Sequence, residues 1–376
     1  MIRGQSSAFS SGVAVCAWIY SMTSIDAPAT PYTYTRGDEL FGRAQQVIPG
    51  GVYSHLGPLG GCHIPRTAFP QFASRAEGTR FLDVDGNEFI DYLCGYGPNV
   101  LGYGDPEVRA AARAQEALAD VVTTPAPIMV EFAELLVDTV ASADWAYFAK
   151  TGGDVTTLAV MTARAATGRR RIVFFEGYYH GVAPWTQKPG VPGVLDQDVA
   201  GNIEVPWNDF EALRAVFTEH RGEIAALIAN CYNVSALCGH DSLRDVVSSV
   251  FYTGSYWMSA VPFAAGITTL TKLRRIDGPA RFRELGTRLT SGLVEVAAAS
   301  GYTLVTSGEP ALFYLRLADD DSPTLHQRWI AECVRRGAFL VSHHNHFVNA
   351  ALTETDIDRT LDIADDAFAA LLDAGA

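Results

Sequence analysis

Lysine is scarce in this chain, and so is positive charge. Three lysines occur among 376 residues, and 42 acidic residues outnumber 28 basic residues. The formal net charge of −14 argues against nucleic acid or an anionic membrane surface as a partner. Any function that depends on a lysine therefore has three candidates, which are Lys150, Lys188 and Lys272.

The chain also lacks cysteines at metal-ligand spacing and long apolar runs. We interpret its six scattered cysteines as reduced thiols of a cytoplasmic protein. The apolar run from Gly12 to Tyr20 is too short to span a membrane. Its flanks fit a signal peptide poorly, because they offer little beyond Arg3 and a serine-rich stretch. We expect no membrane segment, and Met22 is an alternative start of the protein.

The stretch from Trp145 to Gly181 organises the rest of the chain. An apolar strand is predicted at its start, and Thr151 to Asp154 then breaks the strand with two glycines. Helical spacing of apolar residues follows from Val155, Gly168 ends that helix, and Ile172 to Phe175 forms the next strand. The helix start leaves backbone N–H groups at which a phosphate can bind. An ordinary βαβ unit has the same form.

The amino-acid sequence of this stretch resembles that of a known family. Residues 148–154 read F-A-K-T-G-G-D and residues 175–181 read F-E-G-Y-Y-H-G, which is similar to the class III aminotransferases and above all to their glutamate-1-semialdehyde aminomutase-like branch. The resemblance implies an α/β protein of the PLP-dependent transferase fold type I, with a mostly parallel central sheet and a small α+β C-terminal domain. We divide the chain into a disordered tail, an N-terminal arm with a hairpin, a large cofactor-type domain and the small domain, at residues 1–32, 33–100, 101–275 and 276–376.

The same resemblance implies a cofactor site. The glycine turn would hold the phosphate of pyridoxal phosphate, and Tyr179, beside His180, would stack on its pyridine ring. Ser255 matches a threonine that reaches the cofactor phosphate of the neighbouring subunit, or else it caps a helix over residues 257–275. The expected cofactor-binding residues are Gly152, Gly153, Asp154, Tyr179, His180 and Ser255.

The resemblance is interrupted after the strand predicted at Ile224–Ile228. The family continues there with two βα units, which carry an Asp-Glu-Val segment and the Schiff-base lysine. Here Ala229–Tyr232 follows directly, and the position of the lysine falls on Ala226. Two units, roughly 60 residues at about 30 per unit, are therefore absent. A true deletion and a faulty gene model both fit this observation.

The gap changes the expected chemistry. It removes the lysine and the carboxylate that would contact the pyridine nitrogen, so the catalytic residues are unknown. Lys150 is a weak substitute for that lysine, and we interpret Lys188 and Lys272 as solvated. Pyridoxal or pyridoxamine phosphate is expected to bind non-covalently, or no cofactor binds. The N-terminal arm also lacks the family's arginine, because Tyr53–Pro58 has none and Arg66 does not match its position, so an α-amino-acid carboxylate lacks its partner.

The gap also changes the expected sheet and assembly. The short loop from Ala229 to Asn233 favours an antiparallel hairpin of Ile224–Ile228 with Val234–Cys238, within a reduced five-stranded sheet. Apolar surface left by the missing strands favours a homodimer, or a heterodimer with a complete homologue. His344 and His346 alternate along a predicted strand, but the set is too small for us to expect a metal site.

Three functions stay open. The chain is a working pyridoxal enzyme that acts on a small amine or carbonyl compound. Alternatively, it is a repurposed PLP-independent enzyme or ligand-binding protein that uses the same pocket. The third reading is a non-catalytic or truncated copy that pairs with a complete homologue.

Overall fold

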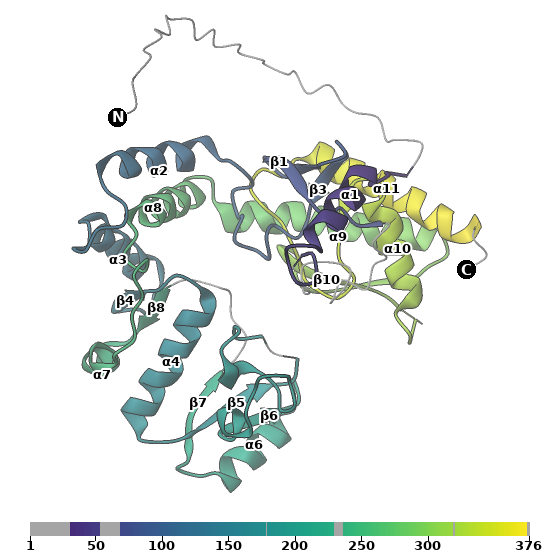
Figure 1. Cartoon of the computed structure of the whole chain (residues 1–376). Helices are drawn as coiled ribbons and strands as arrows, with labels where there is room; N and C mark the ends of the chain where they lie inside the picture. The colour runs from purple at the N-terminus through teal and green to yellow at the C-terminus, as the bar shows by residue number, and fades with distance from the viewer. Residues whose placement is uncertain (1–30, 53–67, 178, 229–235, 319, 374–376) are drawn as a thin grey trace, which may run out of the picture.

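The computed structural model describes residues 31–52, 68–177, 179–228, 236–318 and 320–373 (Figure 1). The two ends of the chain pack together, and the middle of the chain forms a separate part of the molecule. We call residues 31–104 together with 276–373 the terminal region, and residues 105–275 the middle region. In the described chain, no helix is both long enough and apolar enough to cross a lipid bilayer.

The terminal region contains two sheets. The predicted hairpin is confirmed, since β2 and β3 pair antiparallel around the turn at Gly86, which has φ +90°. β3 then pairs in parallel with β11, about 250 residues further on, in a sheet of order β1-β2-β3-β11. A second sheet has the order β12-β10-β9. The strands are β1 (Ala73–Glu77), β2 (Arg80–Asp83), β3 (Glu88–Asp91), β9 (Leu304–Glu309), β10 (Leu312–Leu317), β11 (Ala338–Phe339) and β12 (His346–Phe347).

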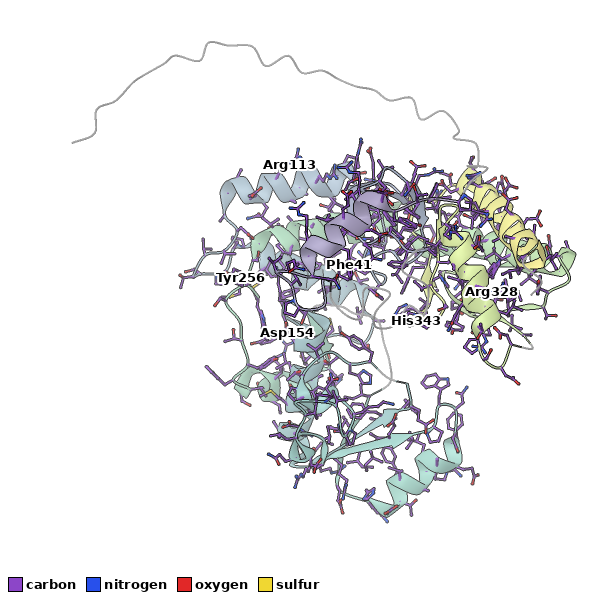
Figure 2. The ribbon with its side chains drawn as sticks, turned by 45° about the vertical axis from the view of Figure 1, so that its right-hand side comes forward. Phe41, Arg113, Asp154, Tyr256, Arg328 and His343 are labelled. Atoms are coloured by element: carbon purple, nitrogen blue, oxygen red, sulfur yellow. The ribbon has the colours of Figure 1, made fainter. Side chains whose placement is uncertain are left out.

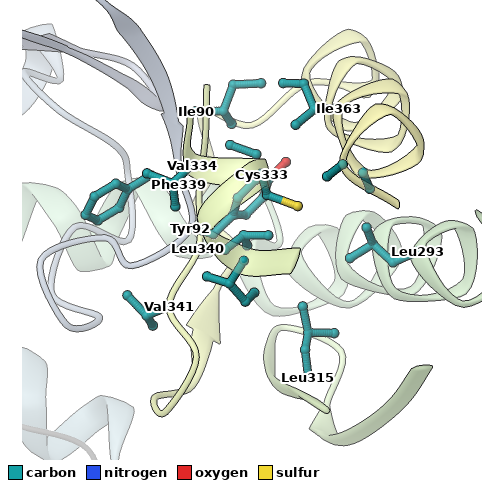
Figure 3. Packing of buried hydrophobic residues seen from close by; sticks show 14 of the residues in the cluster. Ile90, Tyr92, Leu293, Leu315, Cys333, Val334, Phe339, Leu340, Val341 and Ile363 are labelled. Carbon is teal, nitrogen blue, oxygen red and sulfur yellow. The ribbon is translucent and has the colours of Figure 1, made fainter. Parts of the chain in front are cut away.

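One continuous hydrophobic core holds the terminal region together (Figure 3). Apolar residues of the N-terminal hairpin, such as Phe89, pack in it with Leu293, Trp329 and Phe368 from the C-terminal helices. Trp329 is fully buried, and its ring stacks on Phe368 with 4.8 Å between centroids. The helices are α1 (Thr35–Ala44), α9 (Gly278–Ala299), α10 (Thr324–Val334) and α11 (Glu354–Asp373).

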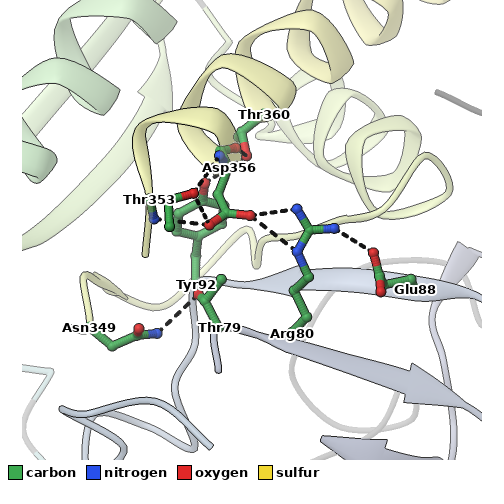
Figure 4. A network of polar contacts seen from close by, with 8 residues as sticks. All are labelled: Thr79, Arg80, Glu88, Tyr92, Asn349, Thr353, Asp356 and Thr360. Carbon is green, nitrogen blue, oxygen red and sulfur yellow. Dashed lines mark hydrogen bonds and ion pairs between the residues drawn. The ribbon is translucent and has the colours of Figure 1, made fainter. Parts of the chain in front are cut away.

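A polar network also joins the N-terminal hairpin to α11 (Figure 4). Arg80 forms an ion pair with Asp356 at 2.5 Å and another with Glu88. The capping box that the sequence indicates at Thr353 is present, because Asp356 accepts from the N–H of Thr353 at 2.9 Å and donates its own N–H to the Thr353 hydroxyl at 3.2 Å. The network ties the first strands of the chain to its last helix.

The middle region has helices around two small sheets. Its strands are β4 (Trp145–Phe148), β5 (Arg171–Phe175), β6 (Asn202–Val205), β7 (Ile224–Ile228) and β8 (Ala236–Gly239). Its helices are α2 (Pro106–Leu118), α3 (Ile128–Thr139), α4 (Gly152–Thr167), α5 (Asp196–Val199), α6 (Phe210–Glu219), α7 (Arg244–Ser249) and α8 (Ala260–Arg275), with 3-10 turns at Pro184–Thr186 and Asp241–Leu243. The order of strand, helix and strand predicted from Trp145 onward is present as β4, α4 and β5, but β4 and β5 lie in different sheets, so they do not form a βαβ unit within one sheet.

The hairpin predicted between β7 and β8 is wrong. β7 pairs in parallel with β5, in a sheet of order β6-β5-β7, and β8 pairs antiparallel with β4. The five strands expected for the reduced sheet are therefore divided between two sheets. Loop length was the only argument for the hairpin, whereas side-chain packing on α4 places each strand in its own sheet. The loop itself lies outside the described residues.

Candidate functional site

The glycine turn forms the first turn of α4. Thr151 is the N-cap, and Asp154 closes a capping box with it, accepting from the Thr151 N–H at 2.8 Å and from its hydroxyl at 2.9 Å. Asp154 is therefore engaged with the cap rather than presented to a ligand. The N–H groups of Gly152 and Gly153 lie at the positive end of this 16-residue helix, where an anion is stabilised.

The loop after β5 packs directly on this turn, which brings the two sequence motifs together. The Thr156 hydroxyl donates to the carbonyl of His180 at 2.6 Å. Gly181 has φ +114°, and a Cβ there would come within 2.6 Å of the Gly153 Cα. Glycine at position 181 is what lets the loop approach the helix start so closely, whereas a Cβ at position 153 would meet the loop at an ordinary 3.5 Å.

Two described aromatic residues of the loop, Tyr179 and His180, differ in environment. Tyr179 is 62% exposed beside the turn, whereas the His180 ring is buried against Phe174, at 5.3 Å between centroids. Burial lowers the pKa of His180, so the ring is neutral near pH 7. The exposed phenol of Tyr179 can cover a flat ligand, and the buried ring of His180 supports the loop by packing against Phe174.

A second support for the loop is Trp185, which the sequence motifs did not indicate. Trp185 donates its ring N–H to the Thr157 hydroxyl at 3.2 Å and lies nearly parallel to Phe174, with 6.0 Å between centroids. Its carbonyl accepts from the Asn202 side chain at 2.7 Å. The two threonines after the glycines, Thr156 and Thr157, were the available signal, because hydroxyls in a first helical turn can fasten a neighbouring loop.

The three lysines lie in different surroundings. Lys272 is less solvated than the sequence suggested, because its side chain is 20% exposed and its ammonium forms ion pairs with Asp105 at 2.6 Å and Glu107 at 2.9 Å. Lys188 is more exposed and contacts Glu204 at 3.3 Å. Lys150 is exposed just before the glycine turn. A hydrogen bond from Ser259 chiefly lowers the pKa of Asp120, and the charge of Lys150 adds to this effect.

Ser255 lies in an exposed turn ahead of α8. Its alternative interpretation as a helix N-cap is wrong, because α8 begins at Ala260 and Ser259 occupies the N-cap position. The Ser259 hydroxyl donates to Asp120 at 2.5 Å, which fixes this helix start against the loop after α2. Figure 2 shows that Tyr256, in the same turn as Ser255, lies at the outside of the middle region.

The histidine run does not form a metal site in the described part of the chain. His346 is fully buried and begins β12, whereas His344 is half-exposed and precedes the strand, so the two do not alternate along one strand. No group of three potential ligands occurs among the described residues. Arg66 and Tyr53–Pro58, which bear on a substrate carboxylate, lie outside them.

Comparison with known proteins gives consistent results. The class III aminotransferase pattern matches residues 64–230. An aminopentol aminotransferase of Sphingopyxis macrogoltabida is 34% identical, over 90% of this chain and 95% of its own length. A glutamate-1-semialdehyde 2,1-aminomutase of Desulforamulus reducens is 28% identical, over 90% of this chain and 98% of its own.

Solved structures agree with this result. The FumI protein of a Sphingopyxis species, described in its PLP internal aldimine form, superimposes with a TM-score of 0.85 at 34% identity, covering 90% of this chain and 97% of that one. A glutamate-1-semialdehyde aminomutase of Pseudomonas aeruginosa in complex with PMP gives 0.77 at 14% identity, over 89% and 94%, which speaks for the fold alone.

The alignment with the aminopentol aminotransferase bears on the sequence gap. It extends over 405 positions, whereas the whole chain has 376 residues. The relative therefore carries residues without a counterpart here, although nearly all of both chains is matched. The family pattern ends at residue 230, inside the segment where the sequence resemblance is interrupted.

Proposed function

This chain belongs to the class III aminotransferase family, whose PLP-dependent fold type I it shares, and from that premise we propose that it keeps a phosphate site for a pyridoxal-type cofactor without a lysine to bind it covalently. The observation that supports this proposal most strongly is the close packing of Gly181 on Gly153 at the start of α4. It keeps a helix N-terminus open at the side where the loop presents Tyr179.

The residues at the phosphate end fit the cofactor. The N–H groups of Gly152 and Gly153 would bind the phosphate, and Thr156 holds the loop in place through the His180 carbonyl. Tyr179 would cover one face of the ring. When bound, such a cofactor supplies an electron-withdrawing ring that stabilises negative charge on an attached substrate carbon.

The residues at the other end of the cofactor do not fit transamination. By the family resemblance, Ala226 takes the position of the family's lysine, and Lys188 and Lys272 are engaged in ion pairs. Without that lysine, the chain lacks the group that carries the proton between substrate and cofactor in the family. We therefore favour pyridoxamine phosphate as the ligand, because it needs no covalent link to the protein.

A matched pair of variants tests the phosphate site. Gly153→Pro removes one N–H at a position early in the helix where proline fits, while Gly153→Ala keeps the N–H, and its Cβ would meet the Gly181 Cα at an ordinary 3.5 Å. Calorimetric titration with pyridoxamine phosphate should show binding about tenfold weaker or more for Gly153→Pro and nearly unchanged for Gly153→Ala. Equal binding by all three proteins would move the phosphate site elsewhere.

The missing lysine has its own test. Protein mixed with pyridoxal phosphate, reduced with borohydride and digested should yield no stoichiometric adduct at a defined lysine. Lys150→Arg serves as the control for non-specific labelling. A stoichiometric adduct at Lys150, absent from Lys150→Arg, would show that this residue replaces the family lysine and would restore transamination of a small amine or carbonyl compound.

Two other functions rest on the same scaffold. A repurposed pocket would bind a ligand without a phosphate, and a non-catalytic copy would act by pairing with a homologue. The pairing alternative is favoured by Phe251 and Tyr256, which are 93% and 64% exposed in the segment that precedes α8. We propose a two-fold homodimer, or a heterodimer with a complete homologue, through this segment in the cytoplasm. A concentration-independent monomer in light scattering would contradict the homodimer.

A further inference from the structure

Each of the two small sheets of the middle region ends in a strand with one unpaired edge. β7 pairs with β5 and β8 pairs with β4, and among the described strands neither has a partner on its other side. An unpaired edge presents a row of backbone N–H and C=O groups, which is a template for another strand.

The two edges belong to one interrupted layer, because α4 packs on both sheets. Leu158 lies in a cluster with Trp145 of β4 and Leu237 of β8. Val160, two residues further along the same helix, lies in another cluster with Phe174 of β5 and Ile228 of β7. Figure 1 shows α4 running alongside both sheets, and β7 and β8 are the strands of the two sheets that lie nearest to it.

Neither edge carries the protection that strand edges usually have. β7 reads I-A-A-L-I and β8 reads A-L-C-G, without a charged residue or a proline in either strand. Exposed edges normally carry lysine, proline or a bulge, because these residues prevent unwanted pairing. Such apolar composition is typical of interior strands, yet Leu227 of β7 is 40% exposed.

We propose that the β7 and β8 edges form an acceptor site for an apolar, strand-forming segment of a separate polypeptide. That polypeptide is homologous to the part of the relatives that this chain lacks. Its strands would pair with the two edges by backbone hydrogen bonds. They would also cover the surface of α4 that lies between the cluster of Leu158 and the cluster of Val160. The proposal does not depend on cofactor binding, because its contacts are backbone edges and apolar side chains.

The choice of occupant follows from the lengths of the aligned chains. The relative matches both flanks of the gap but has more aligned positions than this chain has residues. A second copy of this chain would bring the same two edges and no additional strand. A separate segment that supplies the missing strands is therefore the occupant that completes the layer.

The probe is the segment of the Sphingopyxis macrogoltabida aminopentol aminotransferase that aligns between Ile228 and Ala236 of this chain, produced as a fusion to a soluble carrier. The full chain is mixed with the probe, and hydrogen exchange of its peptides is followed together with mass by light scattering. We expect a 1:1 complex in which exchange of β7 and β8 amides slows by about tenfold or more, while the terminal region is unchanged.

Variants distinguish pairing at the strand edges from non-specific association. Leu227→Lys places a charge on the β7 edge and should abolish the protection, whereas Val305→Lys, on the half-exposed β9 strand, should leave it intact. Circular dichroism of each variant alone confirms that it is folded. A scrambled probe of the same composition should not protect.

Three results would overturn the proposal. One is unchanged exchange of β7 and β8 with the native probe. Another is equal protection by the scrambled probe. The third is protection that grows with the concentration of this chain alone, which would assign the edges to a second copy. None of these results bears on the titration of Gly153 variants with pyridoxamine phosphate, so the two proposals fail separately.

Discussion

The terminal and middle regions bury their apolar residues in different ways. In the terminal region 33 buried residues form one connected cluster, which links strands from the first hundred residues to helices of the last hundred. Among the described residues of the middle region, the clusters of buried apolar residues are four small ones with three members each. A cooperative unit needs a continuous core, so we expect the middle region to open at lower free energy than the terminal region.

The difference follows from the sheets rather than from composition. α4 contributes Leu158 and Val160 to two neighbouring clusters, and each cluster lies on a different small sheet. A strand between β7 and β8 would join these clusters into one core. The terminal region needs no such addition, because β3 and β11 already join the two ends of the chain.

The largest effect is expected from breaking the core of the terminal region. Trp329→Ala removes a fully buried ring that stacks on Phe368, and should lower the free energy of unfolding of this region by about 3–5 kcal/mol. Urea unfolding followed by circular dichroism measures it. Trp207→Ala, at a residue 60% exposed in the middle region, should cost far less. Similar losses for both variants would contradict the comparison of the two regions.

How far the sequence predicts this fold depends on the distance between the partners. Local signals were sufficient for α4 and its glycine C-cap at Gly168, and for the capping box of Thr353 with Asp356. The β3–β11 pairing could not be predicted, because no turn or spacing in the sequence links strands so far apart. The β7–β8 hairpin was wrong for the related reason that a short loop does not decide which edges pair.

The candidate site was predictable in its motifs and not in its details. The sequence indicated the glycine turn and Tyr179, and the structure places them together through Gly153 and Gly181. It did not indicate Trp185, because the indole contact to Thr157 depends on how the loop folds back over the helix. It also suggested a shared face for His344 and His346, which fails because β12 begins only at His346.

Mild acid should reduce the stability advantage of the terminal region, which contains two fully buried histidines. Burial lowers the pKa of His326 from 6.5 to about 4 and that of His346 to about 3, with Arg316 adding to the first effect. Both folded pKa values lie below the unfolded value, so the unfolded chain binds more protons below pH 6.5. The contribution of each histidine to the stability of the terminal region is fully present above pH 6.5. It falls by up to about 1.4 kcal/mol for each pH unit below that value.

Urea midpoints at pH 6.5 and 5.5 measure this slope. His346→Gln should reduce it, because glutamine does not titrate and its carbonyl can accept the Val341 N–H that His346 accepts at 3.1 Å. His344→Gln, at a half-exposed ring, should leave the slope nearly unchanged. A pH-independent terminal transition between these values would refute the assignment to the buried histidines.

A smaller effect is expected from the polar link between hairpin and α11. Asp356→Ala leaves Arg80 without one of its partners and removes the carboxylate half of the capping box of α11, at a side chain that is almost fully buried. We expect a loss of about 2 kcal/mol in the terminal region. Asp358→Ala, which breaks the exposed ion pair with Arg288, should cost less than about 1 kcal/mol. If both variants cost the same, the link of Figure 4 adds nothing beyond a surface contact.

The smallest expected effect is on the stability of the middle region, and it tests whether the two regions open separately. Pyridoxamine phosphate at about ten times its dissociation constant should stabilise the region that binds it by on the order of 1 kcal/mol, since a ligand that binds only the folded form adds RT ln(1 + [L]/Kd). Hydrogen exchange should slow in β5 and at the start of α4, and stay the same in Trp329 and its neighbours in α10. The terminal region lacks the glycine turn, so it has no reason to respond. Equal slowing in both regions would mean that they open as one unit, and the clusters around Leu158 and Val160 would then be coupled to the large core despite the interrupted sheet.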